Sequence, residues 1–364
     1  MMPLADPEVS IVIPILNEAE NLRPLMEGLA RQKDARMEVI FSDGGSGDGT
    51  PARARKLGEE LSLEVDVVEG PPGRGGQLNR GAARARAKYL LFLHADSTFS
   101  DPNALRDGLS AISEESLAKG SSRVAGKFRL RFHRTEQDQQ FGYYFYESKA
   151  RLLRRECSHG DQGLLLPRSF FDEVGPFDQL FSMLAETRLA DRVLDAGRLI
   201  LLPGEIITSA RRFEVEGLRQ RQTVNALIMN FAAIKLHLFF RRLPDLYPAQ
   251  HEARQLKVPL LLREVHRMLG ELPLRERLTI WYATGSYVRR NAWQLAFACD
   301  AWRNRRRGIP PGSGMTPILD TYDRRIDRLA DNPLSNIISL SLVWCWSHLS
   351  CTRLLRGRRN PHLP

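Results

Sequence analysis

Apolar runs and amphipathic segments alternate through the first part of the chain. Short runs rich in β-branched residues predict buried strands at 9–15, 38–42 and 63–68, and an apolar stretch predicts another at 89–94. Segments with helical spacing or small residues separate them. This alternation is typical of a doubly wound α/β sheet, in which ligands bind beyond the carboxyl ends of the strands.

The same pattern extends to about Ser209 and then changes. Asn17 and Glu20 have capping-box spacing after the first strand, so we expect a helix to start there. Further elements are predicted as helices at 77–87 and 186–195 and as strands at 124–132, 163–166 and 198–202. Beyond residue 212 the pattern is helical, with a Pro/Gly-rich break at 308–317.

Composition excludes disorder and a protein with many membrane spans, since 26% of the residues are charged and 43% are hydrophobic. The net charge of +10 lies in the C-terminal third, where residues 241–364 contain 21 Lys and Arg against 10 Asp and Glu. Such a basic segment usually contacts phosphates, including those of anionic lipids. The four cysteines have no paired metal-ligand spacing and the N-terminus shows no signal segment, so we expect a cytoplasmic protein.

A glycine-rich loop follows the second predicted strand. Asp43 ends that strand, and the glycines of GGSGDG allow the backbone to approach a ligand while the carboxylate contacts a base or ribose. A tight turn that uses glycines for positive φ explains the loop equally well. Both interpretations stay open at this point.

Three further residues are candidates for the chemistry. Asp96 lies just past the fourth strand, where a carboxylate can ligate a divalent cation that bridges two phosphates, with His94 assisting or orienting it. Arg74 lies between two glycines and can contact a phosphate, or it is a solvated loop arginine. Glu186 opens a helix, where the helix dipole alone would favour an acid.

Several short segments, in order and at strand ends, resemble the motifs of glycosyltransferase family 2, the inverting enzymes of GT-A fold, over residues 9–240. They are SIVIPILNEAENL, FSDGGSGDGT, GRGGQLNRG, LFLHADS and GDQGLLLPRSFFDEVGPFD. The resemblance implies a Rossmann-like, mixed and mainly parallel sheet with helices on both faces. It also implies a catalytic domain at 1–240 and a basic, mainly helical region at 241–364.

The resemblance assigns roles to individual residues. The donor side would comprise Pro14, Asn17, Glu18, Asp43, Gly44, Arg74, Asn79, His94 and Ala95. Asp96 would be the ligand of Mg²⁺ or Mn²⁺, and Glu186 the catalytic base. Gly160, Asp161 and Gln162 would lie on the acceptor side. His94 and Gly44 stand where the family usually has acids, and the His-Ala-Asp triplet resembles a cytoplasmic bacterial branch of the family.

The implied activity is transfer of one sugar from a UDP-linked donor to an acceptor hydroxyl. The Gln-x-x-Arg-Trp motif and the membrane spans of processive synthases are absent from the sequence. A lipid-linked or phosphorylated acceptor fits the basic tail, and no nucleic acid is expected. Two alternatives remain: a degenerate binding module, since acids are replaced, and a nucleotidyltransferase, which would place its Gly-rich loop where this chain has PILNEAE.

The tail contains an uncharged segment, 332–352, bordered by arginines. A broad apolar helical surface is predicted there, formed by Ile337, Ile338, Leu340, Leu342, Trp344, Cys345 and Leu349. Its serines, asparagines and histidine disfavour a spanning helix. The segment either lies on an anionic membrane surface as a peripheral anchor, or is a core helix docked on 218–300 against Trp281, Trp293 and Trp302.

Overall fold

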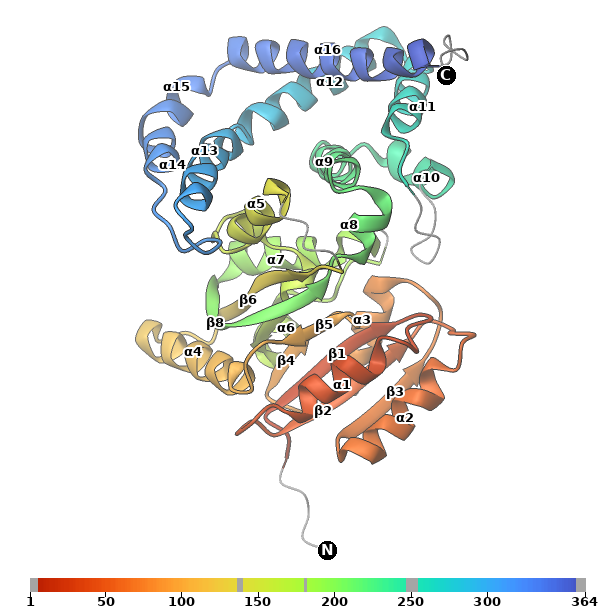
Figure 1. Ribbon diagram of the computed structural model, residues 1–364, viewed down its shortest axis with the longest axis vertical. Helices are drawn as coiled ribbons and strands as arrows, with labels where there is room; N and C mark the ends of the chain where they lie inside the picture. The colour runs from red at the N-terminus through yellow and green to blue at the C-terminus, as the bar shows by residue number, and fades with distance from the viewer. Residues whose placement is uncertain (1–5, 136–139, 180–181, 247–254, 358–364) are drawn as a thin grey trace, which may run out of the picture. The chain divides into compact units, whose positions relative to one another are not determined.

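The computed structural model describes residues 6–135, 140–179, 182–246 and 255–357 (Figure 1). The chain forms two compact units, residues 1–138 with 146–210 and residues 139–145 with 211–364. The main division between the compact units follows residue 210. The end of the catalytic domain at residue 240, inferred from the sequence, stays a prediction.

The first unit is built on one mixed eight-stranded sheet with the order β3-β2-β1-β4-β7-β6-β8-β5. The strands are β1 (Val9–Ile15), β2 (Met37–Asp43), β3 (Glu64–Glu69), β4 (Tyr89–Phe92), β5 (Ser97–Phe99), β6 (Val124–His133), β7 (Leu164–Pro167) and β8 (Arg198–Ser209). β1 to β4 are mutually parallel, whereas β7 is antiparallel to both β4 and β6. The α/β fold with a mixed sheet is confirmed.

Helices cover both faces of this sheet, which explains the uninterrupted apolar character of β1. Ile11 and Ile13 pack in the core formed with α1 (Leu22–Ala30), α2 (Thr50–Leu61) and α4 (Ala104–Lys119). Val12 points to the other face and packs with α3 (Arg74–Arg84), α6 (Arg168–Val174) and α7 (Ala185–Ala196). Successive strand residues alternate between faces, so burial of both requires apolar residues at every position.

The strand predicted at 198–202 is longer, because β8 continues to Ser209. The prediction stopped at Pro203 and Gly204, which usually end a strand. The pairing of β6 with β8 shifts here, from Lys127 opposite Leu201 to Arg129 opposite Glu205. A bulge thus accommodates both residues, and β8 then pairs with β5, a strand that the sequence did not predict.

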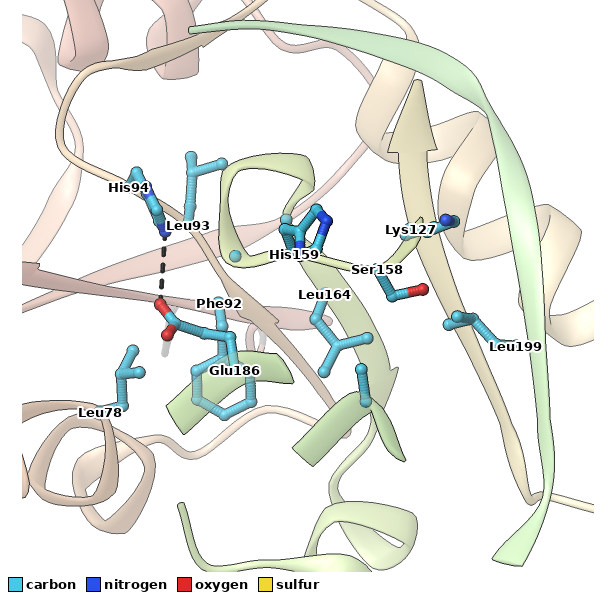
Figure 2. Close-up of a pocket in the computed structure, with 13 residues that line it drawn as sticks. Leu78, Phe92, Leu93, His94, Lys127, Ser158, His159, Leu164, Glu186 and Leu199 are labelled. Carbon is cyan, nitrogen blue, oxygen red and sulfur yellow. Dashed lines mark hydrogen bonds and ion pairs between the residues drawn. The ribbon is translucent and has the colours of Figure 1, made fainter. Parts of the chain in front are cut away.

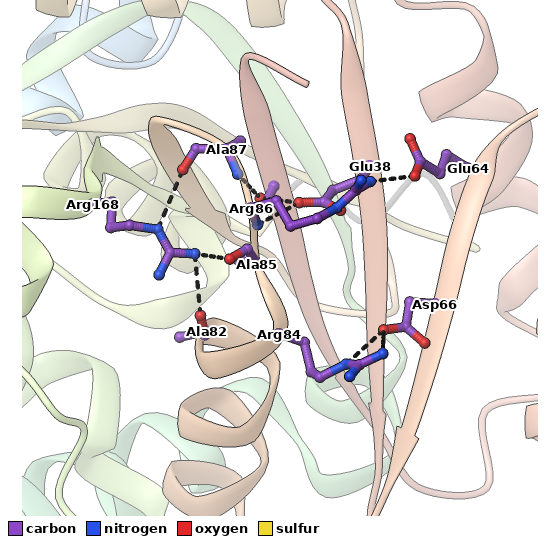
Figure 3. A network of polar contacts seen from close by, with 10 residues as sticks. Glu38, Glu64, Asp66, Ala82, Arg84, Ala85, Arg86, Ala87 and Arg168 are labelled. Carbon is purple, nitrogen blue, oxygen red and sulfur yellow. Dashed lines mark hydrogen bonds and ion pairs between the residues drawn. The ribbon is translucent and has the colours of Figure 1, made fainter. Parts of the chain in front are cut away.

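A polar network at the amino ends of β1 and β2 ties the α3–β4 connection to the sheet (Figure 3). The buried carboxylate of Glu38 accepts hydrogen bonds from Ser10 Oγ at 2.6 Å and Arg86 Nε at 2.9 Å. Arg168 donates to the carbonyls of Ala85 and Ala87. Burial alone would raise the pKa of Glu38, but the hydrogen bonds from Ser10 and Arg86 hold it below its ordinary value. The network stabilises the edge opposite the candidate site.

The second unit is helical in its described part. It contains α8 (Arg211–Glu216), α9 (Leu218–Ala233), α10 (His237–Leu246), α11 (Val258–Gly270), α12 (Leu274–Arg290), α13 (Trp293–Arg306), α14 (Pro317–Thr321), α15 (Asp327–Ala330) and α16 (Pro333–Gly357). The first residues of α5 (Phe141–Ala150) also belong to it. The predicted helical tail is therefore confirmed. Among the described helices, none is long and apolar enough to cross a membrane.

Candidate active site

The parallel strands β1, β2 and β4 bring the loops that follow them to one edge of the sheet. The loop after β1 is fastened to the loop after β2 by hydrogen bonds. Asn17 N donates to Ser46 Oγ at 2.9 Å, and Asn17 Oδ1 accepts from Gly47 N at 2.9 Å. Glu18 N donates to Thr50 Oγ1 at 3.0 Å. Asn17 and Glu18 thus lie together with the Gly-rich loop, and their contact with a donor stays a prediction.

These bonds also correct the predicted helix start. Asn17 has φ 56°, a left-handed conformation that a helix cannot continue, and α1 begins only at Leu22. The capping-box spacing of Asn17 and Glu20 therefore does not cap a helix. The side chain of Asn17 bonds to the neighbouring loop instead.

Asp43 is buried at the end of β2 and holds the Gly-rich turn. Its Oδ2 accepts hydrogen bonds from Gly45 N at 2.8 Å and Ser46 N at 2.9 Å. Gly45 has φ 91°, which requires glycine. Of the two interpretations of this loop, the tight turn accounts for the contacts that the Asp43 carboxylate makes. The same hydrogen bonds fix the carboxylate at the sheet edge.

Gln77, which sequence reasoning did not single out, lies beneath the Gly-rich loop and bonds to the ends of two strands. Its Nε2 donates to the carbonyls of Ile15 and Ser42, both at 2.8 Å, and so joins the ends of β1 and β2. A Cβ on Gly44 would lie 3.0 Å from the same side chain. Glycine at position 44, where the family usually has an acid, thus makes room for Gln77.

Arg74, His94 and Glu186 converge on one point. Arg74 Nε donates to Glu186 Oε1. His94 Nε2 lies 3.3 Å from the same oxygen, as the dashed line in Figure 2 shows. Arg74 was predicted in a loop, with the helix beginning at 77, but α3 begins at Arg74 itself. Gly73, with φ 134°, provides the turn into the helix, so Arg74 is presented from a helix N-terminus.

The environment of Glu186 sets its charge. Glu186 is almost completely buried in the first turn of α7. Burial alone would raise its pKa, but the Arg74 guanidinium and His94 outweigh this effect and hold the pKa at about 2. Glu186 is therefore ionised at physiological pH, and its ion pair with Arg74 limits its basicity.

Asp96 and Asp161 add two carboxylates next to this centre. Asp96 is exposed between β4 and β5, and it accepts one long hydrogen bond, from Thr208 Oγ1 at 3.3 Å. A strand, β5, follows it directly. Asp161 Oδ1 is buried without a hydrogen-bond partner among the described residues. Burial raises the pKa of Asp161, and the Asp96 and Glu186 carboxylates add to the rise against the effect of His94.

The remaining predicted residues have structural contacts. The Asn79 side chain bonds to the backbone of Phe177, through Nδ2 at 2.9 Å and Oδ1 at 2.8 Å. Gln162 is fully buried, and its Nε2 donates to Ala150 O at 2.6 Å. Pro14 and Ala95 are buried as well. The structure thus brings Arg74, His94, Asp96, Asp161 and Glu186 together, and gives Asn79 and Gln162 positioning contacts.

A pocket beside Glu186 contains a buried lysine, Lys127, that the sequence did not reveal. Lys127, Ser158 and His159 line it opposite Glu186 and His94 (Figure 2). Lys127 Nζ donates to the carbonyls of Cys157 at 2.7 Å and Leu152 at 2.9 Å, and burial lowers its pKa to about 8. Both partners lie at least 25 residues away in the chain. A lysine inside an apolar strand was the one available signal.

Metal ligands are few in this region. Within the described ranges, no three His, Cys, Asp or Glu side chains are grouped so that they could hold a metal ion by themselves. Asp96 and Asp161 are nevertheless suitable oxygen ligands, and the free Oδ1 of Asp161 is an acceptor that still requires a donor or cation.

Comparison with known proteins gives consistent results. A family model described as Glycosyl transferase family 2 matches residues 10–175. A PGL/p-HBAD biosynthesis glycosyltransferase of Mycobacterium bovis is 30% identical over 187 residues, which are 50% of this chain and 68% of that protein. Glycosyltransferase AglE of Haloferax volcanii is 25% identical over 206 residues, covering 55% of this chain and 66% of that protein.

A solved structure also resembles the chain. It is the mannosyltransferase PcManGT from Pyrobaculum calidifontis, in complex with GDP-Man and Mn²⁺. The TM-score is 0.48 at 17% sequence identity, and the match covers 94% of this chain and 88% of that one.

Proposed function

The chain belongs to glycosyltransferase family 2, and we propose that it transfers a single sugar from a nucleoside diphosphate sugar to an acceptor hydroxyl, with inversion at the anomeric carbon. The observation that carries the proposal is the convergence of Glu186, Arg74 and His94 beside Asp96 and Asp161. A carboxylate base, a guanidinium and cation ligands are groups that can catalyse this reaction. The donor in the proposal is a UDP-sugar.

Glu186 is the proposed base. Its carboxylate takes the proton of the acceptor hydroxyl as that oxygen attacks the anomeric carbon from the side opposite the diphosphate, so one displacement inverts the configuration. An efficient base has a pKa near the working pH, and the Arg74 ion pair keeps Glu186 far below this range. A diphosphate that competes for the Arg74 guanidinium would therefore make Glu186 more basic.

Arg74 is the proposed partner of the diphosphate. It stands at the N-terminus of α3, where backbone N–H groups and the helix dipole favour an anion. Its Nη2 is buried without a hydrogen-bond partner among the described residues. A phosphate oxygen would accept a hydrogen bond from this donor. The guanidinium would then neutralise part of the negative charge that develops on the leaving diphosphate.

Asp96 and Asp161 are the proposed ligands of Mg²⁺ or Mn²⁺. Mg²⁺ is usually bound by one or two carboxylates together with substrate phosphates, which fits a site that lacks three protein ligands. When bound, the cation would neutralise charge on the diphosphate. Asp96 contributes an exposed carboxylate, and Asp161 contributes the buried Oδ1.

Gly160 is proposed to leave the space that this centre needs. A Cβ at this position would lie 2.7 Å from both Glu186 Oε1 and His94 Nε2. Gly160→Ala is therefore expected to displace both side chains and lower kcat by about 10²-fold, measured by release of nucleoside diphosphate. Gly270→Ala is the control, because a Cβ there meets nothing within 4 Å. Normal turnover of the Gly160 variant would show that the Glu186–His94 arrangement is not used in catalysis.

Asp43 provides the test of donor binding. UDP with Mn²⁺ is expected to raise the melting temperature of the wild-type chain, because a ligand that binds only the folded state stabilises it. Asp43→Ala should weaken binding of UDP and UDP-sugars alike, since its place at the sheet edge is on the nucleoside side. The control is Asp66→Ala, which removes a partly exposed carboxylate paired with Arg84. Equal UDP affinity of the Asp43 variant and the wild type would reject the donor assignment.

A further inference from the structure

The second unit exposes an uncharged apolar stripe along α16. The stripe comprises Leu334, Ile337, Ile338, Leu342, Cys345 and Leu349, all exposed, with Leu342 at 66% and Leu334 at 67%. At 100° per residue these positions share one side of the helix. The outward face of a helix on a soluble unit normally carries charged side chains. Residues 332–352 contain none.

The opposite side of α16 packs on α12 and α11, and this packing holds the stripe in place on the outside of the unit. α16 runs beside α12 (Figure 1), and a Cβ on Gly285 would lie 2.4 Å from Asn336 O. Arg289 Nη2 donates to Asp331 Oδ1 at 2.6 Å just before α16, and His266 Nε2 lies 3.1 Å from Ser347 Oγ. Docking on 218–300 is thus observed, with Trp281 beside His266. Of the other two tryptophans named with this alternative, Trp293 is buried and Trp302 is half exposed.

Other apolar side chains of this unit are exposed as well. α12, which packs on α16, exposes a row at i, i+4 spacing, Leu274, Leu278 and Tyr282, which are 64%, 59% and 41% exposed. Trp344 and Trp346, each 45% exposed, lie on the two flanks of the stripe. Indole rings prefer the boundary between apolar and aqueous phases.

The surroundings of the stripe are strongly basic. The second unit contains 26 Lys and Arg against 12 Asp and Glu, whereas the first contains 27 against 31. Arg324, Arg325 and Arg328 are exposed just before α16. Arg263 lies near the other end of α16. Its guanidinium is close enough to Cys351 to counteract the rise in the pKa of that thiol that burial causes. Arg353, Arg356, Arg358 and Arg359 follow in the sequence, and their side chains lie outside the described residues.

We propose that the α16 stripe and its arginine border dock on the surface of an anionic lipid bilayer, with α16 lying in the interface. An uncharged apolar face inserts at the headgroup level, and the arginines beside it meet the lipid phosphates. A second copy of the chain fits this face less well. Each second unit has 14 more basic than acidic residues, so pairing two copies would bring like charges together.

Flotation of the full chain with vesicles tests this proposal. Binding is expected to vesicles of phosphatidylcholine with phosphatidylglycerol, and to fall as salt is raised, because salt screens the arginines. Phosphatidylcholine alone should bind weakly or not at all. Absence of binding to both vesicles at low salt would overturn the proposal.

Variants separate the stripe from its border. Leu342→Glu is expected to weaken vesicle binding by about tenfold or more, because it places a charge where an apolar side chain inserts. The control is Leu117→Glu, at a position 80% exposed on α4, which should bind normally. Arg324→Gln and Arg325→Gln should each weaken binding by about fivefold. Circular dichroism verifies that each variant is folded.

Two further outcomes would contradict the proposal. The first is vesicle binding by Leu342→Glu equal to that of the wild type. The second is a dimer of the free chain in sedimentation that Leu342→Glu dissociates, without any vesicle binding, which would assign the stripe to an interface between copies.

Discussion

Glu186→Gln is expected to lower kcat by about 10²–10⁴-fold without weakening UDP binding. The substitution keeps the size of the side chain and a carbonyl oxygen for Arg74 and His94, but removes the basic carboxylate. Turnover at saturating donor and UDP titration of both proteins give the two numbers. A defect in kcat without a defect in UDP binding is characteristic of a base that acts on the acceptor.

The matched control for Glu186 is Glu38. Glu38 is also a buried carboxylate bonded to an arginine, Arg86, but it lies at the opposite edge of the sheet. Glu38→Gln should destabilise the fold and leave kcat nearly unchanged. If Glu186→Gln keeps a kcat within tenfold of the wild type, Glu186 is not the base.

Asp96→Ala is expected to remove the divalent-cation dependence of UDP binding and lower turnover by about 10²–10³-fold. The reason is that Asp96 offers an exposed carboxylate that accepts one long hydrogen bond from the described residues, so it is available to a cation that the diphosphate shares. Calorimetric titration of UDP with and without Mn²⁺ measures the dependence directly.

Asp101→Ala is the control for Asp96, because Asp101 is an exposed carboxylate whose Oδ1 accepts a hydrogen bond from Asn103 N. Its loss should change the local turn without changing nucleotide binding. UDP binding by Asp96→Ala that keeps the wild-type response to Mn²⁺ would remove Asp96 from the metal site.

The strands of the sheet could be predicted well because burial on both faces leaves a direct trace in the sequence. β1 and β4 are apolar at nearly every position and β2 is apolar at its centre, and the predicted ranges of the three strands differ from the observed ones by at most two residues. Element starts next to the site were predicted less well. α1 starts late because Asn17 bonds to residues 46 and 47, and such partners leave no local pattern.

In the candidate site too, some residues could be predicted from the sequence and others could not. Asp96 and Glu186 could be proposed from the sequence because each stands at the end of a recognisable element within a motif. Gln77 and Lys127 were missed because their roles depend on carbonyls that only the folded chain brings close. For α16, docking on the preceding helices is observed on one side of the helix, and the other side exposes the apolar stripe, whose binding to a membrane stays a proposal.

Release of nucleoside diphosphate from a panel of nucleotide sugars tests the central claim most directly. The full chain, incubated with Mn²⁺ and each UDP- or GDP-sugar in turn, is expected to release the nucleotide from at least one donor, slowly by hydrolysis when no acceptor is present. EDTA and Glu186→Gln should each suppress this release. Binding of UDP with no release from any donor, in the presence or absence of added acceptor hydroxyls, would contradict the claim and identify the chain as a binding module.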